Sequence, residues 1–374
     1  MDETFEHELN RAGAGLRRWL VLLLAAIFCC SAAIQPAWAA AGGSTAPAPR
    51  TVIPVGHTAG VKLFSEGLLV VNLSESTDAE GRECPARACG IQTGDLLLEL
   101  NREDLKSTEQ LQAALQENGD RPVSLTVKRG ARTLSLTTTP VSGSDGVYRL
   151  GAWVRDSMAG IGTVTYYDPQ TGMFGALGHG ITDVDTAQLM PVSSGSLMPS
   201  VVAGVKKGGK GVPGELTGDF QTNVELGTLL CNSDQGIFGR LADTGMVTGQ
   251  PVQVARRGEV HCGQATILCN VSGDQVEEFF IKITKILENG EGGRDMVIRV
   301  TDDRLLSKTG GIVQGMSGSP ILQDGKLVGA VTHVLVSDAA RGVIRRPFAV
   351  SSFMATFWIS AVSATSKVIS SETT

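Results

Sequence analysis

The chain has 374 residues, of which 42% are hydrophobic and 19% charged, and its formal net charge is -6 at pH 7. This composition excludes an intrinsically disordered chain, and the length is enough for two ordinary domains behind a leader. The negative charge argues against a nucleic-acid-binding surface. The 46 glycines, together with short runs of Val, Ile, Thr and Leu, favour a β-rich fold with tight turns.

Seven cysteines are present, and Cys29 and Cys30 lie in an apolar leader. The other five allow at most two disulfide bridges; they are Cys84, Cys89, Cys231, Cys262 and Cys269. We interpret them as small buried hydrophobic residues, with Cys84 and Cys89 as the pair closest in sequence that could bridge. The sequence has no C-x-x-C pair and no His/Cys cluster with zinc spacing, so we expect no metal and no cofactor.

The N-terminus carries an export signal. Residues 19–34 contain no charge, arginines precede them, and Ala37-Trp38-Ala39 has the pattern that signal peptidase accepts. The run is long for a signal core and short for a spanning helix, so a cleaved signal and a retained anchor both stay open, and both export the chain beyond residue 40. We predict a cytoplasmic N-terminus (1–18), a signal or anchor segment (19–40) and a flexible linker (41–50).

Residues 51–141 are predicted to form the first exported unit. Strands are expected at 67–73, 95–100, 123–128 and 133–138, and a helix at 107–116. The segment 85–95, PARACGIQTGD, is followed by an apolar strand and Asn101. This arrangement resembles a PDZ domain of the kind attached to bacterial exported proteases.

A PDZ module adds a peptide as a strand beside an exposed sheet edge and binds its terminal carboxylate in a nest of backbone N–H groups. The matching loop here is Gly60-Val61-Lys62-Leu63. We therefore expect a peptide or protein partner at this loop. An ordinary strand start, or a module that regulates without binding a free terminus, is the alternative.

Residues 147–350 are predicted to form the second unit. Strand candidates are 162–167, 173–177, 252–255, 266–270, 279–286, 296–300, 311–313 and 326–334. Strands at this density, with turn signals such as DPQTG at 168–172, predict an antiparallel barrel or sandwich. The expected fold class is therefore mainly β.

The segment 311–321, GIVQGMSGSPI, is the strongest chemical signal. It resembles the G-x-S-G-[GS]-P motif of trypsin-like proteases, in which a tight turn exposes the serine Oγ and aims two backbone N–H groups at the oxyanion. By this pattern Ser317 is the nucleophile, and the amides of Gly315 and Ser317 form the oxyanion hole. Ser319 is the rival serine, and a Gly-Ser-Pro turn without catalytic function is the alternative.

A catalytic serine needs a base, and His179 is the best candidate among five histidines. A predicted strand delivers it into a turn of small residues, and the order His then Ser is that of the chymotrypsin clan. His333 is the second candidate, and His261 has no supporting context. Spacing alone does not identify the acid that would orient the base. The candidate carboxylates are Asp183, Asp185, Asp219, Asp234 and Asp302.

Several segments together resemble the stage IV sporulation protein B peptidases of endospore-forming bacteria. They are GALGHGITD around His179, GKGVPGEL near Gly211, GIFGRL at 236–241 and the long run 300–334 around Ser317, behind the PDZ-like unit. The resemblance implies a PDZ-containing serine peptidase with a chymotrypsin-like β-barrel, and it implies Asp302 as the acid. It also implies self-cleavage and cleavage of a membrane-associated regulator of the pro-sigma-K processing complex, in the space between mother cell and forespore.

The C-terminal segment departs from this family. After about residue 340 the chain lacks the usual GYG-type run, and residues 351–374 read as a divergent tail, so a closing strand near the substrate pocket is in question. A non-catalytic PDZ adaptor on a protease-like scaffold is the competing hypothesis. A general periplasmic stress protease fits less well, because in this chain the PDZ-like unit precedes the catalytic one.

Overall fold

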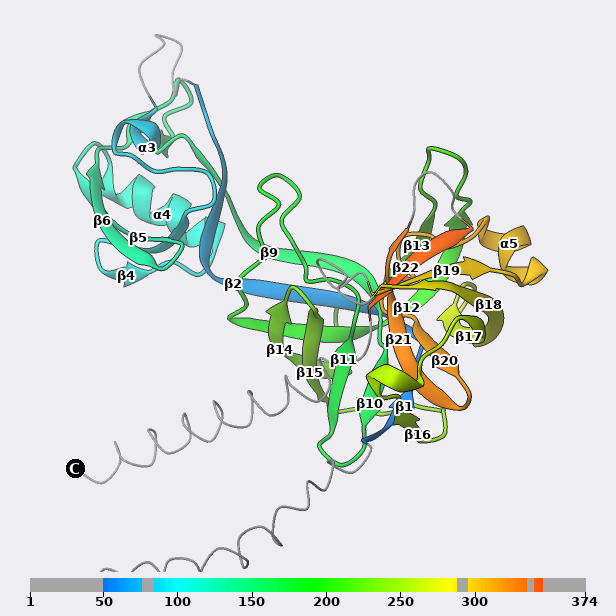
Figure 1. Ribbon diagram of the computed structural model, residues 1–374. Coiled ribbons are helices and arrows are strands. Elements are labelled where there is room, and N and C mark those ends of the chain that lie inside the picture. The colour runs from blue at the N-terminus through cyan, green and yellow to red at the C-terminus, as the bar shows by residue number, and fades with distance from the viewer. Residues whose placement is uncertain (1–49, 76–83, 288–294, 335–339, 346–374) are drawn as a thin grey trace, which may run out of the picture. The chain divides into compact units, whose positions relative to one another are not determined.

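The computed structural model describes residues 50–75, 84–287, 295–334 and 340–345 (Figure 1). The predicted leader at 1–40, most of the linker and the divergent tail at 351–374 lie outside these residues. Strands dominate the described part, which confirms the expectation of a mainly β fold. No helix of the described residues is long and apolar enough to span a membrane.

The PDZ-like unit is built from the second half of β2 (Thr58–Leu73) and the segments that come after it. These are α3 (Pro85–Ala88), β3 (Leu96–Leu100), β4 (Glu103–Asp104), α4 (Thr108–Asn118), β5 (Val123–Arg129), β6 (Arg132–Thr138), β7 (Val141–Ser142) and β8 (Tyr148–Arg149). Its core consists of aliphatic side chains that include Leu68, Leu97 and Leu125. The strands and the helix predicted for this unit are confirmed.

Helix α4 begins and ends where its sequence dictates. Ser107 is the N-cap: its hydroxyl accepts from the Gln110 amide at 3.2 Å, and Gln110 Oε1 accepts from the Ser107 amide at 3.2 Å. Leu111 and Leu115, one turn apart, are buried on the face toward the unit's core. Gly119, with φ +67°, ends the helix.

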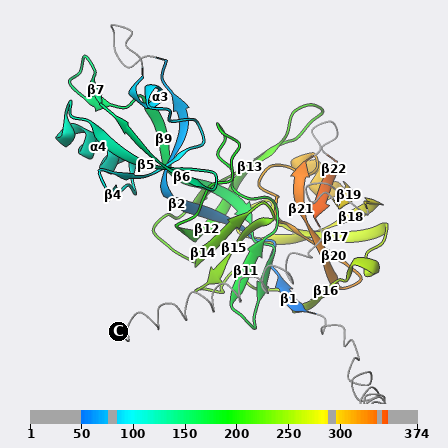
Figure 2. The same ribbon diagram turned by 60° about the vertical axis from the view of Figure 1, so that its left-hand side comes forward.

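The peptidase unit contains two groups of strands (Figure 2). The first group is β1 (Thr51–Pro54), the first half of β2, β9 (Ala152–Thr163), β10 (Tyr166–Asp168), β11 (Met173–Ala176), β12 (Ser194–Lys206), β13 (Glu215–Phe220), β14 (Gly227–Ser233) and β15 (Gly236–Leu241). The second is β16 (Val252–Val254), β17 (Gly263–Asn270), β18 (Val276–Ile286), β19 (Met296–Val300), β20 (Pro320–Gln323), β21 (Lys326–Val334) and β22 (Arg341–Arg345), with the short helices η1 (Arg257–Glu259) and α5 (Asp303–Thr309).

Six strands of the second group close into a barrel. The pairs run from β17 to β18, β19, β22, β21 and β20, and β20 pairs again with β17, so each strand has two neighbours. Strand β22 completes this ring, because Arg341–Arg345 pairs with both β19 and β21. The strand predicted at 311–313 is wrong, because left-handed glycines after α5 turn this segment toward Ser317.

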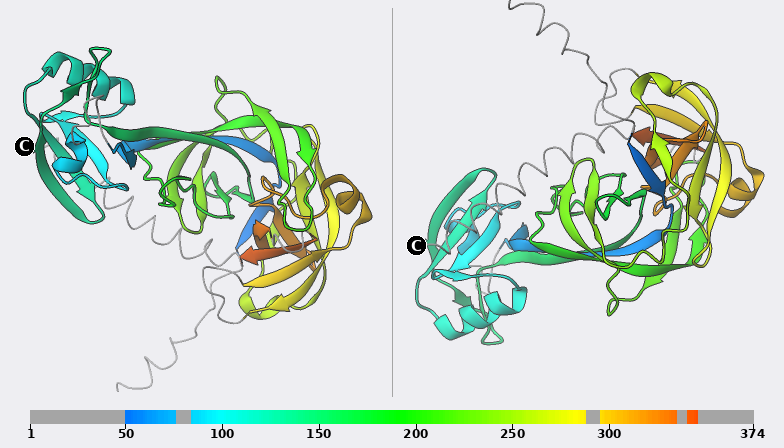
Figure 3. Two further views of the ribbon diagram at one scale, coloured as in Figure 1. Left: turned by 90° about the horizontal axis from the view of Figure 1, so that it is seen from above. Right: turned by 90° about the horizontal axis from the view of Figure 1, so that it is seen from below.

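The predicted start of the PDZ-like unit, residue 51, is too early. Strand β1 pairs with β10 and β16, and the first half of β2 pairs with β12, so residues 51–64 belong to the peptidase sheet. Strands β2 and β9 lie side by side along most of their length (Figure 3). The PDZ-like unit is therefore inserted between two long strands that begin or end in the peptidase.

Candidate active site

Ser317 sits in a glycine-supported turn between α5 and β20. Gly315 and Gly318 adopt φ +94° and +98°, a region that side-chain-bearing residues avoid. A Cβ on Gly318 would lie 2.1 Å from the Thr163 carbonyl oxygen, so a residue larger than glycine does not fit without a shift. The local motif thus shapes the turn as predicted for a serine nucleophile.

Two threonines from the end of β9 and the residues after it hold this turn in place. Thr163 donates through its hydroxyl to Gly315 O at 2.8 Å and through its amide to Ser317 O at 3.2 Å. Thr165 donates to Gly318 O at 2.6 Å. Its oxygen also accepts from the Leu177 amide at 2.7 Å, which ties the turn to the segment that carries His179.

The amides of Gly315 and Ser317 are available for an oxyanion. In the described part of the chain, neither N–H donates to a protein acceptor. Both residues line the same cavity. Two unpaired donors from one tight turn are what stabilises the negative oxygen of a tetrahedral intermediate.

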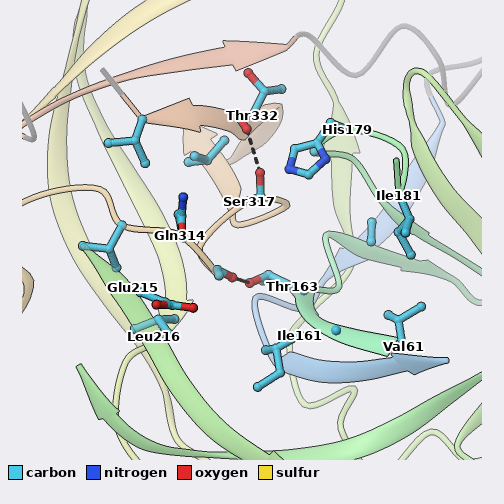
Figure 4. A pocket seen from close by; sticks show the side chains of 18 of the residues that line it. Val61, Ile161, Thr163, His179, Ile181, Glu215, Leu216, Gln314, Ser317 and Thr332 are labelled. Carbon is cyan, nitrogen blue, oxygen red and sulfur yellow. Dashed lines mark hydrogen bonds between the residues drawn. The ribbon is translucent and has the colours of Figure 1, made fainter. Parts of the chain in front are cut away.

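His179 lies beside Ser317 (Figure 4). Strand β11 leads to it, and Gly178 permits the close approach, because a Cβ there would lie only 3.0 Å from Ser317 Oγ. His179 Nδ1 is 2.9 Å from Gly180 O. A carbonyl oxygen can only accept, so we assign the proton to Nδ1, which leaves Nε2 with the lone pair that a general base needs.

The Ser317 hydroxyl donates to Thr332 O at 2.7 Å. This bond is drawn in Figure 4, where the His179 ring stands next to it. The serine proton is therefore held by a backbone carbonyl in this structure, so a transfer to His179 requires the hydroxyl to turn away from Thr332 O.

The cavity in front of Ser317 has a volume of about 790 Å³ and a mainly apolar lining. Val61, Ile161, Ile181 and Leu216 are among its walls (Figure 4), and Glu215 is the one carboxylate among the described residues that line it. His333 also lines it, with its ring centroid 5.9 Å from that of His179. A cavity of this size accommodates several side chains of an extended peptide.

Two protein-family models match this chain, one over the peptidase unit and one over the PDZ-like unit. The family described as "SpoIVB peptidase S55" matches residues 146–344, more than half of the chain, and a PDZ domain matches residues 78–129. This chain belongs to the SpoIVB peptidase S55 family. As an S55 peptidase with a PDZ domain it is a serine endopeptidase, a hydrolase of peptide or protein substrates.

No curated protein matches this S55 peptidase. Similar solved structures include the PDZ domain of the SdrC-like protein from Listeria monocytogenes, at 16% identity, covering 24% of this chain and 87% of that chain, with a TM-score of 0.21. The Rv3671c protease from M. tuberculosis in its active form is 13% identical, with coverage of 53% and 74% and a TM-score of 0.32. The HtrA-type protease AlgW with a decapeptide is 8% identical, with coverage of 79% and 62% and a TM-score of 0.31.

The structure of this S55 peptidase does not bring Asp302 to His179. Asp302 is the N-cap of α5, and its carboxylate accepts from the Arg304 side chain at 2.9 and 3.1 Å, from the Arg304 amide and from the Phe280 amide. The Arg304 guanidinium, with these hydrogen bonds, holds the pKa of Asp302 at about 2. Asp302 does not line the cavity, so the predicted role as orienting acid is corrected to a structural one.

The other candidate carboxylates do not bond to the His179 ring either, within the described residues. Asp183 is buried and anchors its own loop, since Oδ1 accepts from the amides of Asp185 and Thr186. Burial opposes the charge, but the bonds from Thr186 and the nearby Arg155 guanidinium outweigh it and lower the pKa of Asp183. Its role is to shape the loop after His179.

Asn232 is a positioning residue that the sequence analysis missed. From β14, its amide side chain accepts from the Ile181 amide at 2.8 Å and donates to the carbonyls of Ile181 and Met190 at 2.8 and 2.9 Å. It thereby closes the base of the loop that begins at His179. A single Asn in a strand carries no sequence signal for such a role, because its partners become neighbours only in the fold.

The peptide-binding loop predicted at Gly60, Val61, Lys62 and Leu63 is wrong. These residues lie in β2 with β12 on one edge and β9 on the other, so neither edge is open to a peptide. Val61 instead lines the cavity in front of Ser317. The prediction failed because β2 continues from the peptidase sheet into the PDZ-like unit as one strand, and residues 60–63 belong to its peptidase half.

The five described cysteines are free, and this includes Cys84 and Cys89, the pair closest in sequence that could have bridged. Cys84 and Cys269 are buried, as expected of small hydrophobic residues, whereas Cys262 is exposed. Within the described ranges, no group of three His, Cys, Asp or Glu side chains could hold a metal ion.

Proposed function

We propose that this S55 peptidase uses Ser317 as nucleophile and His179 as general base, with the Gly315 and Ser317 amides as its oxyanion hole. The observation that carries this proposal is the convergence of these groups on one cavity: a serine on a tight, glycine-flanked turn, two unpaired amides and a histidine whose Nδ1 is bonded and whose Nε2 we assign the lone pair. No other described serine has such surroundings. Ser319, for comparison, is fully buried.

The reaction follows from these positions. Ser317 Oγ attacks the scissile carbonyl carbon while His179 Nε2 takes the hydroxyl proton, and the two amides bind the resulting oxyanion. His179 then gives the proton to the leaving amine, and an acyl-enzyme remains on Ser317. Water activated by the same histidine releases the acyl group. The Gly180 carbonyl, by accepting from Nδ1, takes the orienting part that a carboxylate takes in a triad.

The physiological part of the proposal rests on the family resemblance. Export through the N-terminal segment 19–40, as a signal or an anchor, would put the catalytic unit in the space between mother cell and forespore. We propose that it cleaves itself there and then cleaves a membrane-associated regulator of the pro-sigma-K processing complex. Incubating the purified chain with the exposed segment of that regulator tests this step, with Ser317→Ala as the inactive control.

The chemical proposal is tested with a fluorophosphonate probe and mass spectrometry on the full chain. We expect wild type to label at Ser317 and to trim itself, and Ser317→Ala to do neither. Ser319→Ala is the matched control: it removes a buried hydroxyl without a partner, and it should label like wild type. Labelling of Ser317→Ala, or a folded wild type that neither labels nor cuts, contradicts the proposal; the second result favours the adaptor hypothesis.

A further inference from the structure

Strand β9 has one edge that pairs with no other described strand. Its partner on the opposite edge is β2, from Ala152 opposite Leu73 to Thr163 opposite Thr58. None of the residues 152–162 is buried. The peptidase half of β2, by contrast, has β9 on one edge and β12 on the other. Strand β9 therefore presents a row of main-chain groups with which a further strand can pair.

The C-terminal half of this edge leads to the nucleophile. The Thr163 amide donates to Ser317 O at 3.2 Å, whereas the next amide, that of Val164, donates at 2.9 Å to the residue before β2. Main-chain groups of successive strand residues point alternately to the two edges, so those of Ile161 and Ala159 face the open edge. Both residues line the cavity in front of Ser317, and Figure 4 shows Ile161 on the same strand as Thr163.

Nothing in the local sequence shields this half of the edge. Residues 158–162 read MAGIG, without the proline or charge by which proteins protect an exposed edge. A Cβ built on Gly160 or Gly162 would have nothing within 4 Å. The edge is therefore suited to an extended peptide, and its continuity with the cavity identifies that peptide as a substrate.

The N-terminal half of the same edge lies beside helix α4. At the start of the helix, the Asp156 carboxylate accepts from the amide and the hydroxyl of Thr108 at 2.9 and 3.2 Å. Further along the helix, Gln116 Oε1 accepts from the Tyr148 amide at 3.2 Å. Helix α4 thus flanks residues 148–156 and faces β9 across a groove. PDZ domains add an extended peptide to an exposed sheet edge of this kind.

A site for a carboxylate lies at the beginning of this groove. Gly151 has φ +75°, and in the described part of the chain the amides of Leu150 and Gly151 donate to no protein acceptor. Successive free amides at such a turn bind an anion, and a peptide C-terminus is one. A peptide with its C-terminus here runs antiparallel to β9, so its preceding residues lie along the strand toward Ser317.

We infer that one extended substrate segment pairs along the whole open edge of β9, with its C-terminal carboxylate at Gly151 and its scissile bond at Ser317. Strand β9 has 12 residues, so about a dozen substrate residues, at about 3.4 Å each, separate that bond from the C-terminus. The peptidase thus cuts at a counted distance from a free C-terminus, and the fragment with the new amine is the part held on β9. The catalytic end rests on the proposed function, whereas the edge and the carboxylate site do not.

The counted distance is tested with a library of peptides of about 25 residues, random in sequence and free of proline. The library is made with a free C-terminal carboxylate and again with a C-terminal amide, and full-length wild type is incubated with each. By mass spectrometry, we expect cuts to cluster about 10–14 residues from a free carboxylate, and amides to be cut about tenfold more slowly and without a cluster. Cuts at no preferred distance, or the same cuts in both forms, overturn the inference.

Ala159→Pro tests the edge itself. Proline removes the N–H that faces the open edge and breaks no bond to β2, so the thermal unfolding transition should remain. Free-carboxylate peptides should be cut about fivefold more slowly and without the cluster. Ala159→Ser keeps the N–H at the same position and is the matched control, in which the cluster should persist. A cluster that persists in Ala159→Pro overturns the pairing on β9; if this variant does not fold, the carboxylate and amide libraries with wild type decide.

Binding separates this inference from the proposed function. Immobilised full-length Ser317→Ala protein, incubated with both libraries together, should retain free-carboxylate peptides about tenfold over amides. Equal retention overturns the carboxylate site. A wild-type chain that neither labels with the fluorophosphonate nor cuts contradicts the proposed function instead, and retention still decides whether the groove binds a C-terminus.

Discussion

His179 and Ser317 come from different groups of strands, and each is placed by backbone contacts of its own neighbourhood. Gly178 lets the histidine segment approach the serine, and Gly180 orients the ring through its carbonyl. The Thr332 carbonyl oxygen accepts the hydrogen bond of the Ser317 hydroxyl. The placement of His179 and Ser317 therefore depends on small residues and main-chain groups rather than on a third charged side chain.

Asp302 should matter for stability and not for chemistry. Asp302→Asn loses the Arg304 ion pair and should lower the free energy of unfolding by about 1 kcal/mol, and Asp302→Ala, which also loses the cap, by about 1–2 kcal/mol. Labelling of Ser317 should stay within about twofold of wild type, whereas an orienting acid would cost about 10⁴-fold in kcat. Denaturant unfolding and labelling rates, measured on the same samples, separate the two roles.

The stabilisation by Asp302 should depend on pH. Its pKa in the folded state, about 2, lies below the ordinary value of 3.8, so the charged carboxylate stabilises the fold above that ordinary value. The contribution is lost as the pH falls toward the folded-state pKa. The difference in unfolding free energy between wild type and Asp302→Asn should shrink between about pH 4 and pH 2. A difference that is constant over this range contradicts the ion pair with Arg304.

The turn that carries Ser317 and the end of β9 are held together by hydrogen bonds. The hydroxyls of Thr163 and Thr165 bond to three backbone groups of the turn and of the His179 segment, which ties the turn to the end of β9. The same strand carries Arg155, which pairs with Asp183 and Asp185 in the loop after His179. A single element thus contacts the segments of both His179 and Ser317.

Gly318→Ala should damage this element. The new Cβ would lie 2.1 Å from Thr163 O at a backbone φ of +98°, and we expect a cost of about 1–3 kcal/mol in stability with loss of most labelling. Gly90→Ala is the matched control, because Gly90 has φ +91° with nothing within 4 Å of a Cβ. Gly90→Ala should introduce a similar backbone strain, and its Ser317 should still be labelled as in wild type. If both variants label equally, steric fit at Gly318 is not what shapes the turn.

At the scale of the whole molecule, the PDZ-like unit interrupts the peptidase and does not precede it. Strand β2 lies between β12 and β9, and Val52, Val61 and Leu63 are buried in the peptidase sheet. The chain must therefore bring the first half of β2 together with strands that lie about 90 to 140 residues further along the sequence. Strands β2 and β9 are shared by the two units, so either unit on its own would lack part of its sheet.

A fragment that starts at the predicted boundary, residue 147, should not fold. It lacks β1 and β2, which would expose the paired edges of β12 and β9 and remove core side chains. We expect residues 50–374 to unfold in a cooperative thermal transition and residues 147–374 to show none by circular dichroism. A cooperative transition in the shorter fragment would restore the two consecutive domains that the sequence predicted.

Features with a local cause could be predicted from the residues alone. The Ser317 turn follows from its glycines, α4 from its capping residues, and the position of His179 from a strand that ends in small residues. The family resemblance rested on such contiguous segments. Each of these needs only neighbours in sequence, so a single chain suffices to recognise it.

The remaining features depend on partners that are distant in the sequence. The apolar run at residues 60–63 has the same pattern whether it binds a peptide or pairs with β12, because alternation of side chains does not name the neighbouring strand. The family resemblance implied Asp302 as the acid, but its carboxylate is bound by the nearby Arg304 and by the Phe280 amide, which the fold brings from 22 residues away. The sequence thus specified the segments that carry His179 and Ser317, and long-range strand pairing decided the place of residues 60–63 and the insertion of the PDZ-like unit between β2 and β9.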